Sequence, residues 1–372
     1  MAGAGKGSPG PAAAPAQRVA VLGSANADLV IQVPRLPAKG ETLAAASLEV
    51  VPGGKGANQA VAAARLAAPT SFVGRVGRDG NGRMMRDAFA AAGVDVAGLA
   101  EVRRARGPPP STPPGTEACA LPRLASSPRA FPATTDRPQE EALPTGCATV
   151  FLLPDGDNSI VIVGGANQSP GWALTEGTKE IIAGAAYLLL QREVPEHVNV
   201  EAAQYARAHG TQVILDAGGS LEPLSPELLA SVDLFSPNET ELANLTGAAR
   251  LEATAEIVAA ARRLRAEHGV GDVLVKLGAR GSLLVGGDRV WHQPAFEVAK
   301  VVDTTAAGDC FTAAVAVGMG RGEGLEAAIR FASAAAAVSV QKKGAIPSLP
   351  GVAEAEAVLA QAANPGAAVA DT

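Results

Sequence analysis

Short apolar runs alternate with longer helix-compatible stretches along most of this chain, and this alternation restricts the fold more than any other feature. A brief apolar run with no polar alternation is typical of a strand that is buried on both faces. Strands are predicted at residues 18–23, 185–190, 212–215, 232–235 and 273–277, and helices at residues 59–67, 198–209, 253–268 and 325–340. This order favours an α/β fold with a central, mostly parallel sheet and helices on both faces. Ligands of such sheets bind at the carboxyl ends of the strands.

Two stretches depart from this alternation because their apolar residues recur at every second position. One covers residues 29–33. The other covers residues 148–153 and 159–163, which are joined by the turn signal Pro154, Asp155, Gly156 and Asp157 and therefore predict a β-hairpin. We interpret both stretches as a small separate sheet that covers the ligand site.

The formal net charge of −6 and the pI near 5.4 argue against a nucleic-acid or anionic-membrane surface, so small molecules are the expected partners. No stretch approaches the roughly 18 uninterrupted apolar residues of a membrane span. The cysteines Cys119, Cys147 and Cys310 form no CxxC pair, and the histidines lack metal-ligand spacing, so neither disulfides nor structural zinc are predicted. These features favour a cytoplasmic protein, with a plastid, another organelle and the nucleus left open as alternatives.

Two segments carry no periodic pattern. Residues 1–17 are mostly Ala, Gly and Pro without the apolar region of a secretory signal, and we expect a flexible tail. Residues 103–144 hold ten of the 27 prolines, which predicts a disordered insert. Pro108, Pro109 and Pro110 suit polyproline II recognition by a partner domain, but Pro-rich composition alone favours solvated filler or a segment created by gene-model error.

The most informative ten residues are 302–311, in which Ala306, Ala307 and Gly308 stand directly before Asp309 and an apolar, helix-compatible stretch. The first N–H groups of a helix lack intrahelical acceptors and lie at the positive end of its dipole. Because the small side chains leave these groups uncovered, such a turn attracts phosphate. Asp309 is then placed to take a proton from a hydroxyl that attacks phosphorus. The alternative is an ordinary Asp N-cap.

A second glycine-rich motif covers residues 52–60. It is not a P-loop, because Glu49 stands where the first glycine is needed and Gly56 follows the lysine. The paired Gly53 and Gly54 allow a ligand to approach the backbone, and Lys55 and Asn58 offer donors to hydroxyl oxygens, which suits a polyol. Asn26 and Asp28 follow the first predicted strand and can share one ligand there. For each motif, a plain glycine or Asx turn is the alternative.

Three further polar groups follow predicted strands. Glu193 comes just after residues 185–190. Asn238 and Glu241 fit either an ordinary capping box or a water-bridged Mg²⁺ site beside phosphates. Lys276 is followed by Gly278 and Gly281, a turn compatible with a nucleotide lying across bare backbone.

Taken in order, these motifs resemble the ribokinase-like (PfkB) carbohydrate kinase family. The most specific are GGKGANQA at residues 53–60 and DTTAAGD at residues 303–309, followed by NETE at residues 238–241. The resemblance implies one kinase domain over residues 18–364, with lid segments near 28–52 and 102–166, and a C-terminal tail at 365–372. By the same resemblance, the β lid closes over the sugar and pairs two subunits into a homodimer.

The resemblance also implies an activity, the ATP-dependent phosphorylation of D-ribose at its 5-hydroxyl. Asp309 is expected to be the general base, and the amides of Ala306, Ala307 and Gly308 the anion hole. The sugar would be held by Asn26, Asp28, Gly53, Gly54, Lys55, Asn58, Glu193 and Asp309. The nucleotide would be bound by Asn238, Lys276, Gly278, Gly281, Gly308 and Ser333, where Ser333 stands at a position at which family members often carry histidine.

Two cations are implied as well. Glu241 would hold Mg²⁺ through water, and a potassium activator would be bound largely through carbonyls at Asp303, Thr305, Ser339, Lys342, Gly344 and Ser348. Three alternatives remain open from the sequence: a kinase for another pentose or for a nucleoside such as adenosine, a sugar-binding sensor without phosphoryl transfer, and a scaffold recruited through the prolines. The Lys55 and Asn58 pair favours a free sugar, and the intact Asp309 turn favours catalysis.

Overall fold

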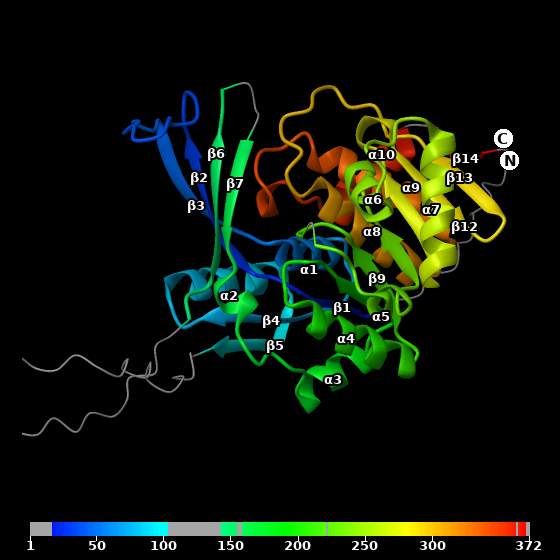
Figure 1. The fold of residues 1–372 in the computed structure, drawn as a ribbon, viewed down its shortest axis with the longest axis horizontal. Coiled ribbons are helices and arrows are strands. Elements are labelled where there is room, and N and C mark those ends of the chain that lie inside the picture. The colour runs from blue at the N-terminus through cyan, green and yellow to red at the C-terminus, as the bar shows by residue number, and fades with distance from the viewer. Residues whose placement is uncertain (1–16, 103–142, 155–157, 221, 362–363, 370–372) are drawn as a thin grey trace, which may run out of the picture.

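The computed structural model describes residues 17–102, 143–154, 158–220, 222–361 and 364–369. Their largest element is a ten-stranded sheet in the order β14-β13-β12-β11-β10-β9-β8-β1-β4-β5 (Figure 1). The strands are β1 (Val19–Leu22), β4 (Thr70–Gly77), β5 (Asp95–Val102), β8 (Tyr187–Leu190), β9 (Gln212–Asp216), β10 (Leu234–Ser236), β11 (Asp272–Lys276), β12 (Ser282–Gly286), β13 (Arg289–Gln293) and β14 (Ala367–Ala368). Pairing is parallel from β5 to β11 and antiparallel from β11 to β14.

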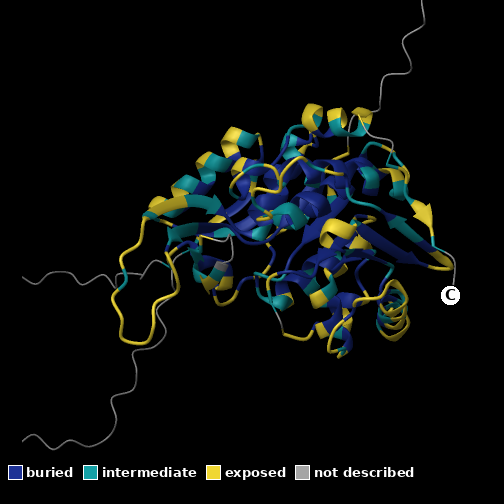
Figure 2. Ribbon diagram, turned by 90° about the horizontal axis from the view of Figure 1, so that it is seen from above, coloured by how far each residue is buried: buried dark blue, intermediate teal, exposed yellow. Residues whose placement is uncertain are grey.

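Helices cover both faces of this sheet because successive strand residues point to opposite sides. In β1, Val19 and Val21 pack into one core, whereas Ala20 and Leu22 pack into the other. The first core contains α1 (Lys55–Arg65), α2 (Gly80–Ala92), α8 (Ala307–Gly320), α9 (Leu325–Ser339) and α10 (Val352–Gln361). The second contains α3 (Glu176–Ala183), α4 (Glu196–Ala208), α5 (Pro226–Leu229), α6 (Glu239–Thr246) and α7 (Thr254–His268). Figure 2 shows the buried sheet between these two layers.

A separate four-stranded sheet stands beside the main one, with the order β3-β2-β6-β7 (Figure 1). Its strands are β2 (Asn26–Gln32), β3 (Ser47–Gly53), β6 (Gly146–Leu152) and β7 (Asn158–Val163). The predicted small sheet and its hairpin are therefore confirmed. We call this sheet the lid. Its register places Asp28, Val51, Ala148 and Ile162 on one face, and Leu29, Val50, Thr149 and Val161 on the other.

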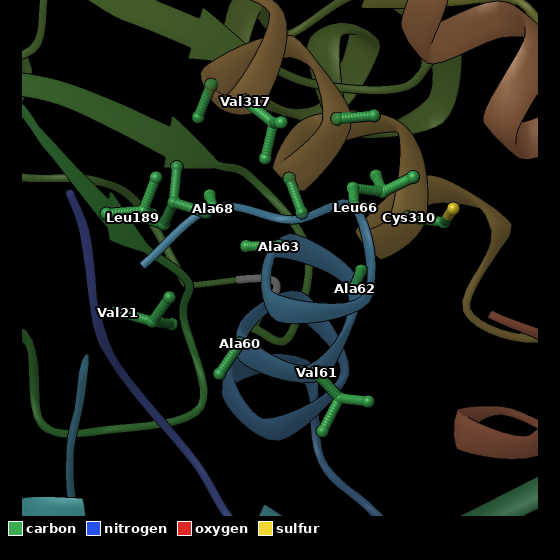
Figure 3. Close-up of a cluster of buried hydrophobic side chains, with 14 of the residues drawn as sticks. Val21, Ala60, Val61, Ala62, Ala63, Leu66, Ala68, Leu189, Cys310 and Val317 are labelled. Atoms are coloured by element: carbon green, nitrogen blue, oxygen red, sulfur yellow. The ribbon is translucent and has the colours of Figure 1, made fainter. Parts of the chain in front are cut away.

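Helices α1 and α8 pack closely because the surfaces that face each other carry small side chains. Figure 3 shows Ala62 and Ala63 of α1 on the side of that helix that faces Cys310 and Val317 of α8. Both helices are largely buried, and alanine contacts allow their backbones to approach closely. This packing brings the second turn of α1 next to the first turn of α8, although about 250 residues separate them in sequence.

Each strand and helix predicted from the apolar pattern is present, within about three residues at its ends except at the start of α1. Strand β4 was not predicted, because Gly74, Arg75 and Gly77 interrupt its apolar run. Two tail predictions need correction. Gln17 donates its N–H to the carbonyl of Gly320 at 2.9 Å, and residues 367–368 form the edge strand β14 rather than a tail.

The reason for β14 lies in the structure of its neighbour. Strand β13 offers unpaired backbone groups at the sheet edge, and pairing satisfies them whatever side chains the added strand carries. The predicted insert at 103–144 lies outside the described residues except for Leu143 and Pro144, as does Cys119. None of the described helices combines the length and the apolar character needed to cross a membrane.

Candidate active site

Asp309 lies in the first turn of α8 and does not cap that helix. The N-cap position is occupied by Ala306 in a left-handed conformation, and no side chain bonds there. The Asp309 carboxylate instead accepts hydrogen bonds from Asn58 Nδ2 at 2.9 Å and, weakly, from Gln59 Nε2 at 3.5 Å. It is 5% exposed. The N-cap interpretation is therefore wrong, and the carboxylate is directed across the helix interface towards α1.

The turn that precedes Asp309 presents free donors. Within the described chain, the N–H groups of Gly308 and Asp309 have no acceptor, whereas the N–H of Ala307 donates to Thr304 at 3.2 Å. An anion at this turn would therefore find the Gly308 and Asp309 amides available first. The anion hole of Ala306, Ala307 and Gly308 stays a prediction, and Ala307 would have to exchange one hydrogen bond to contribute.

The glycines of the second motif are required by close contacts. A Cβ at Gly53 would lie 2.0 Å from Oδ2 of Asp28, and Gly54 has a φ of 90°. Gly54 is the N-cap of α1, so the helix begins directly at Lys55. Lys55 Nζ lies 4.0 Å from Oδ1 of Asp309. The tight β3 to α1 turn thus delivers Lys55 and Asn58 to the same carboxylate.

The remaining predicted sugar ligands surround this point. Asn26 is 3% exposed, and its Oδ1 accepts from Asn167 Nδ2 at 2.7 Å. Glu193 Oε2 accepts from Ser24 Oγ at 2.5 Å and from the N–H of Lys55 at 3.1 Å. Ser24 and Asn167 were missed by sequence reasoning, since Ser24 stands in the loop after β1 and Asn167 in a single 3-10 turn, Gly165–Gln168, and neither belongs to a distinguishing pattern. They fix the orientation of the predicted ligands.

Three carboxylates share this site, and their repulsion and burial set its electrostatics. Burial, followed by the charges of Glu193 and Asp309, raises the pKa of Asp28 to about 7. Burial raises the pKa of Asp309 to about 6, although Lys55 opposes the shift. The Asp309 charge in turn raises the pKa of Lys55, which therefore stays protonated. Oδ1 of Asp28 is buried without a partner among the described atoms. Such an orphaned acceptor suits a ligand hydroxyl.

A separate cavity of about 670 Å³ adjoins the start of α8. Its lining includes Lys276, Gly278, Gly281, Ala307, Gly308 and Ser333, together with the apolar Phe296, Val301 and Val340. Six residues that the sequence placed at or beside the nucleotide are thus brought together. Such an apolar pocket with a few polar groups at one end is typical of a small-molecule site.

Asn238 and Glu241 are not part of that lining. They form the capping box of α6, with Asn238 Oδ1 accepting from the N–H of Glu241 and Glu241 Oε2 accepting from the N–H of Asn238, both at 2.8 Å. Asn238 also forms a backbone bridge with Lys276, which places α6 beside the cavity. Among the described residues, no three His, Cys, Asp or Glu side chains gather closely enough to hold a metal ion.

The residues predicted to bind potassium lie in the loop before α8 and in the stretch from the end of α9 at Ser339 to a short 3-10 helix that ends at Ser348. Asp303 accepts from the N–H of Thr305 at 2.9 Å and from the N–H of Gly344 at 2.8 Å. Burial favours a higher pKa for Asp303, but the hydrogen bond from the Thr305 hydroxyl and these two N–H bonds outweigh it and hold the pKa below its usual range. Ser339 and Ser348 contact each other at 3.0 Å through their hydroxyl groups. The Lys342 ammonium pairs with Glu354, so only its backbone could serve a cation at these loops.

Sequence reasoning also missed Asp216, the last residue of β9. It is 1% exposed and accepts from Lys276 Nζ at 2.6 Å and from Thr312 Oγ1 at 2.8 Å. Its position at the carboxyl end of a predicted strand was the available signal.

The fold, the lid and the site around Asp309 define an α/β sugar kinase. The sequence matches the pfkB family of carbohydrate kinases over residues 16–106 and 135–351, and the chain belongs to that family. It is 42% identical to the ribokinase of Arabidopsis thaliana over 335 residues, which cover 89% of this chain and 78% of that protein. It is 34% identical to the ribokinase of Haemophilus influenzae over 89% of this chain and 94% of that one.

A solved structure agrees with this assignment. The Arabidopsis thaliana ribokinase complexed with ribose and ATP matches the fold with a TM-score of 0.78 at 40% identity, over 92% of this chain and 99% of that one.

Proposed function

We propose that this protein is an ATP-dependent kinase that phosphorylates D-ribose at its 5-hydroxyl. The observation that carries the proposal is the position of Asp309. Its carboxylate lies beside Lys55 and Asn58 on the sugar side, while the preceding residue Gly308, whose N–H has no acceptor among the described residues, lines the nucleotide cavity. The names of the ribokinases to which the chain is similar support ribose as the substrate.

The chemistry follows from this arrangement. The oxygen of the 5-hydroxyl attacks the γ-phosphorus of ATP, and its proton passes to the Asp309 carboxylate. A bond forms between that oxygen and phosphorus, while the bond from phosphorus to the bridging oxygen of ADP breaks. The amides at the start of α8 stabilise the charge on the phosphoryl oxygens. Asn58 and Gln59 orient the carboxylate through their hydrogen bonds.

The sugar would be held by the groups around Asp28. The orphaned Asp28 oxygen and the Lys55 ammonium provide an acceptor and a donor for hydroxyl groups, and Asn26 and Glu193 complete the set. Gly53 and Gly54 let the sugar approach the backbone. A kinase for another pentose or for a nucleoside is the second candidate, because the same donors serve any vicinal diol.

The residues present fit the two implied cations. Mg²⁺ binds enzymes through one or two carboxylates together with substrate phosphates and water. Glu241 offers one carboxylate of which only Oε2 is engaged with the backbone, so it would hold Mg²⁺ through water beside the nucleotide. Bound there, Mg²⁺ supplies charge neutralisation to the phosphates. The loops around Asp303 and Gly344 would hold potassium through their carbonyls, with Thr305, Ser339, Lys342 and Ser348.

The lid also supports the expected homodimer. On the face opposite Asp28, Leu48, Val50, Val161 and Val163 are each between 47% and 59% exposed. A continuous apolar sheet face of this kind is typical of a protein interface. Val50→Asp should therefore shift the sedimentation coefficient from a dimer to a monomer value, whereas a monomeric wild-type protein would contradict the pairing.

We place the protein in the cytoplasm, which fluorescent tagging would test.

Ribose-dependent ADP formation tests the proposed activity directly. The coupled assay should be run with D-ribose, 2-deoxyribose, other pentoses and adenosine, each at the same concentration. D-ribose is expected to give the highest kcat/KM. A higher value for adenosine would favour the second candidate, and no turnover with any of them would favour a sensor.

A further inference from the structure

Four charges alternate in sign between the sugar side and the nucleotide cavity: the buried carboxylates of Asp309 and Asp216 and the partly exposed ammonium groups of Lys55 and Lys276. Asp309 lies 4.0 Å from Lys55, and Asp216 lies 2.6 Å from Lys276. The two pairs meet at Gly218, where a Cβ would lie 2.7 Å from Lys55 Nζ and 3.1 Å from Asp216 Oδ1. Asp216 therefore stands between two ammonium groups, one on each side of the reacting centre.

The Asp216 carboxylate is held rigidly. Thr312 of α8 donates to its Oδ2 at 2.8 Å, and the N–H of Gly218 donates to its Oδ1 at 2.9 Å. Burial alone would raise the pKa of Asp216, but Lys276, Lys55 and these hydrogen bonds outweigh it and hold the pKa below the usual range. The group is therefore a fixed anion and not a proton acceptor. Asp309, whose pKa is raised, is the carboxylate suited to accept a proton.

Lys276 reaches the anion-binding turn. Its Nζ would lie 3.7 Å from a Cβ at Gly308, and the residue lines the nucleotide cavity. An ammonium has three donors. Within the described chain, only the bond to Asp216 is made by this one. Two donors therefore remain beside the Gly308 amide, where the transferring phosphoryl group must lie under the proposed function.

We propose that Lys276 is a catalytic residue that contacts the transferring phosphoryl group, and that Asp216 is a positioning residue that holds both Lys276 and Lys55 in place. This inference rests on the proposed sugar kinase activity and extends it. The Lys276 ammonium donates to phosphoryl oxygens as negative charge moves towards ADP. Asp216 fixes its distance from Gly308 while the same carboxylate attracts Lys55 on the sugar side.

The competing explanation is that Lys276 and Asp216 form only a structural ion pair. Both explanations predict that Lys276→Met lowers the melting temperature, because an unpaired carboxylate is left buried. They differ for the double variant Lys276→Met with Asp216→Asn, which removes the unpaired charge as well. If the pair is structural, the double variant should recover both stability and turnover.

Steady-state kinetics and thermal unfolding of four variants would decide between the two explanations: Lys276→Met, Asp216→Asn, the double variant and Lys179→Met. Lys179 forms a surface pair with Glu176 at 3.1 Å and serves as the matched control. We expect Lys276→Met to lower kcat by roughly 10²- to 10³-fold, the range seen when one oxyanion donor is removed, with little change in the KM for ribose. The double variant should regain the melting temperature but keep the low kcat.

A second measurement does not depend on turnover. Lys276→Met should bind ADP with nearly unchanged affinity, yet lose tight binding of ADP with aluminium fluoride and ribose, which mimics the transferring phosphoryl group. A double variant with kcat within about tenfold of wild type, or unchanged binding of the aluminium fluoride complex, would overturn the inference. Failure of the proposed function itself would be seen separately, as a wild-type protein that forms no ADP with ribose.

Discussion

Asp309→Asn tests the central assignment, and the structure indicates that the fold tolerates it. The carboxylate accepts from the amide nitrogens of Asn58 and Gln59, and a new amide at this position would turn its own donors towards one of them. Oδ1 of Asn58 has no partner among the described atoms. A flip of the Asn58 amide would therefore satisfy the new donor at little cost. The loss measured should then be chemical and not structural.

The magnitude follows from the role of a general base. Such groups contribute about 10² to 10⁴ in rate, which corresponds to roughly 3 to 5 kcal/mol of transition-state free energy. We expect kcat to fall by at least about a hundredfold and the Kd for ribose to change by less than about fivefold. The expected change in the Kd for ribose is small because the other sugar ligands remain in place.

The assay is ribose-dependent ADP release by purified wild type, Asp309→Asn and the control Asp87→Asn, with ribose affinity measured by calorimetry. Asp87 lies exposed on α2, so its substitution should leave kcat unchanged. Thermal unfolding should show each variant folded. If Asp309→Asn retains kcat within about fivefold of wild type, proton abstraction by Asp309 is wrong.

Three further predictions concern protonation and the insert. Because the Asp309 pKa is raised to about 6 and the base must be ionised, kcat/KM should fall below pH 6 to roughly a tenth of its plateau at pH 5, and a flat profile from pH 5 to 8 would contradict this. Asp28→Asn should raise the melting temperature of the sugar-free protein at pH 8 while increasing the KM for ribose. The raised pKa makes the ionised Asp28 destabilising at high pH, so the gain should shrink as the pH falls from 7 to 4. An unchanged melting temperature at pH 8 would count against it. Deletion of residues 105–143 should leave kcat unchanged, and lost activity in a folded deletion variant would show that the segment contributes to the reaction.

Local patterns of the sequence were sufficient to predict the α/β architecture. The run at residues 18–23 predicts a strand buried on both faces because no polar residue interrupts it, and β1 lies inside the sheet as expected. The period-2 stretches predicted the lid for a different reason, because apolar residues at every second position fall on one face of a strand. The small residues before Asp309 and the paired glycines at 53 and 54 predicted the two turns of the proposed site. The glycines are needed in the second turn, where a Cβ at Gly53 would lie 2.0 Å from Asp28 and Gly54 has a positive φ.

Only the tertiary structure decided which groups meet. Gln59 and Asp309 are 250 residues apart, and Asp216 and Lys276 are 60 apart, so no periodicity within one element could pair them. Asp216 resembles any strand-terminal aspartate until β9, β11 and α8 pack together and place Lys276 and Thr312 on its carboxylate. The raised pKa values of Asp28 and Asp309 also arise only on folding, because burial and the approach of other carboxylates do not exist in the extended chain.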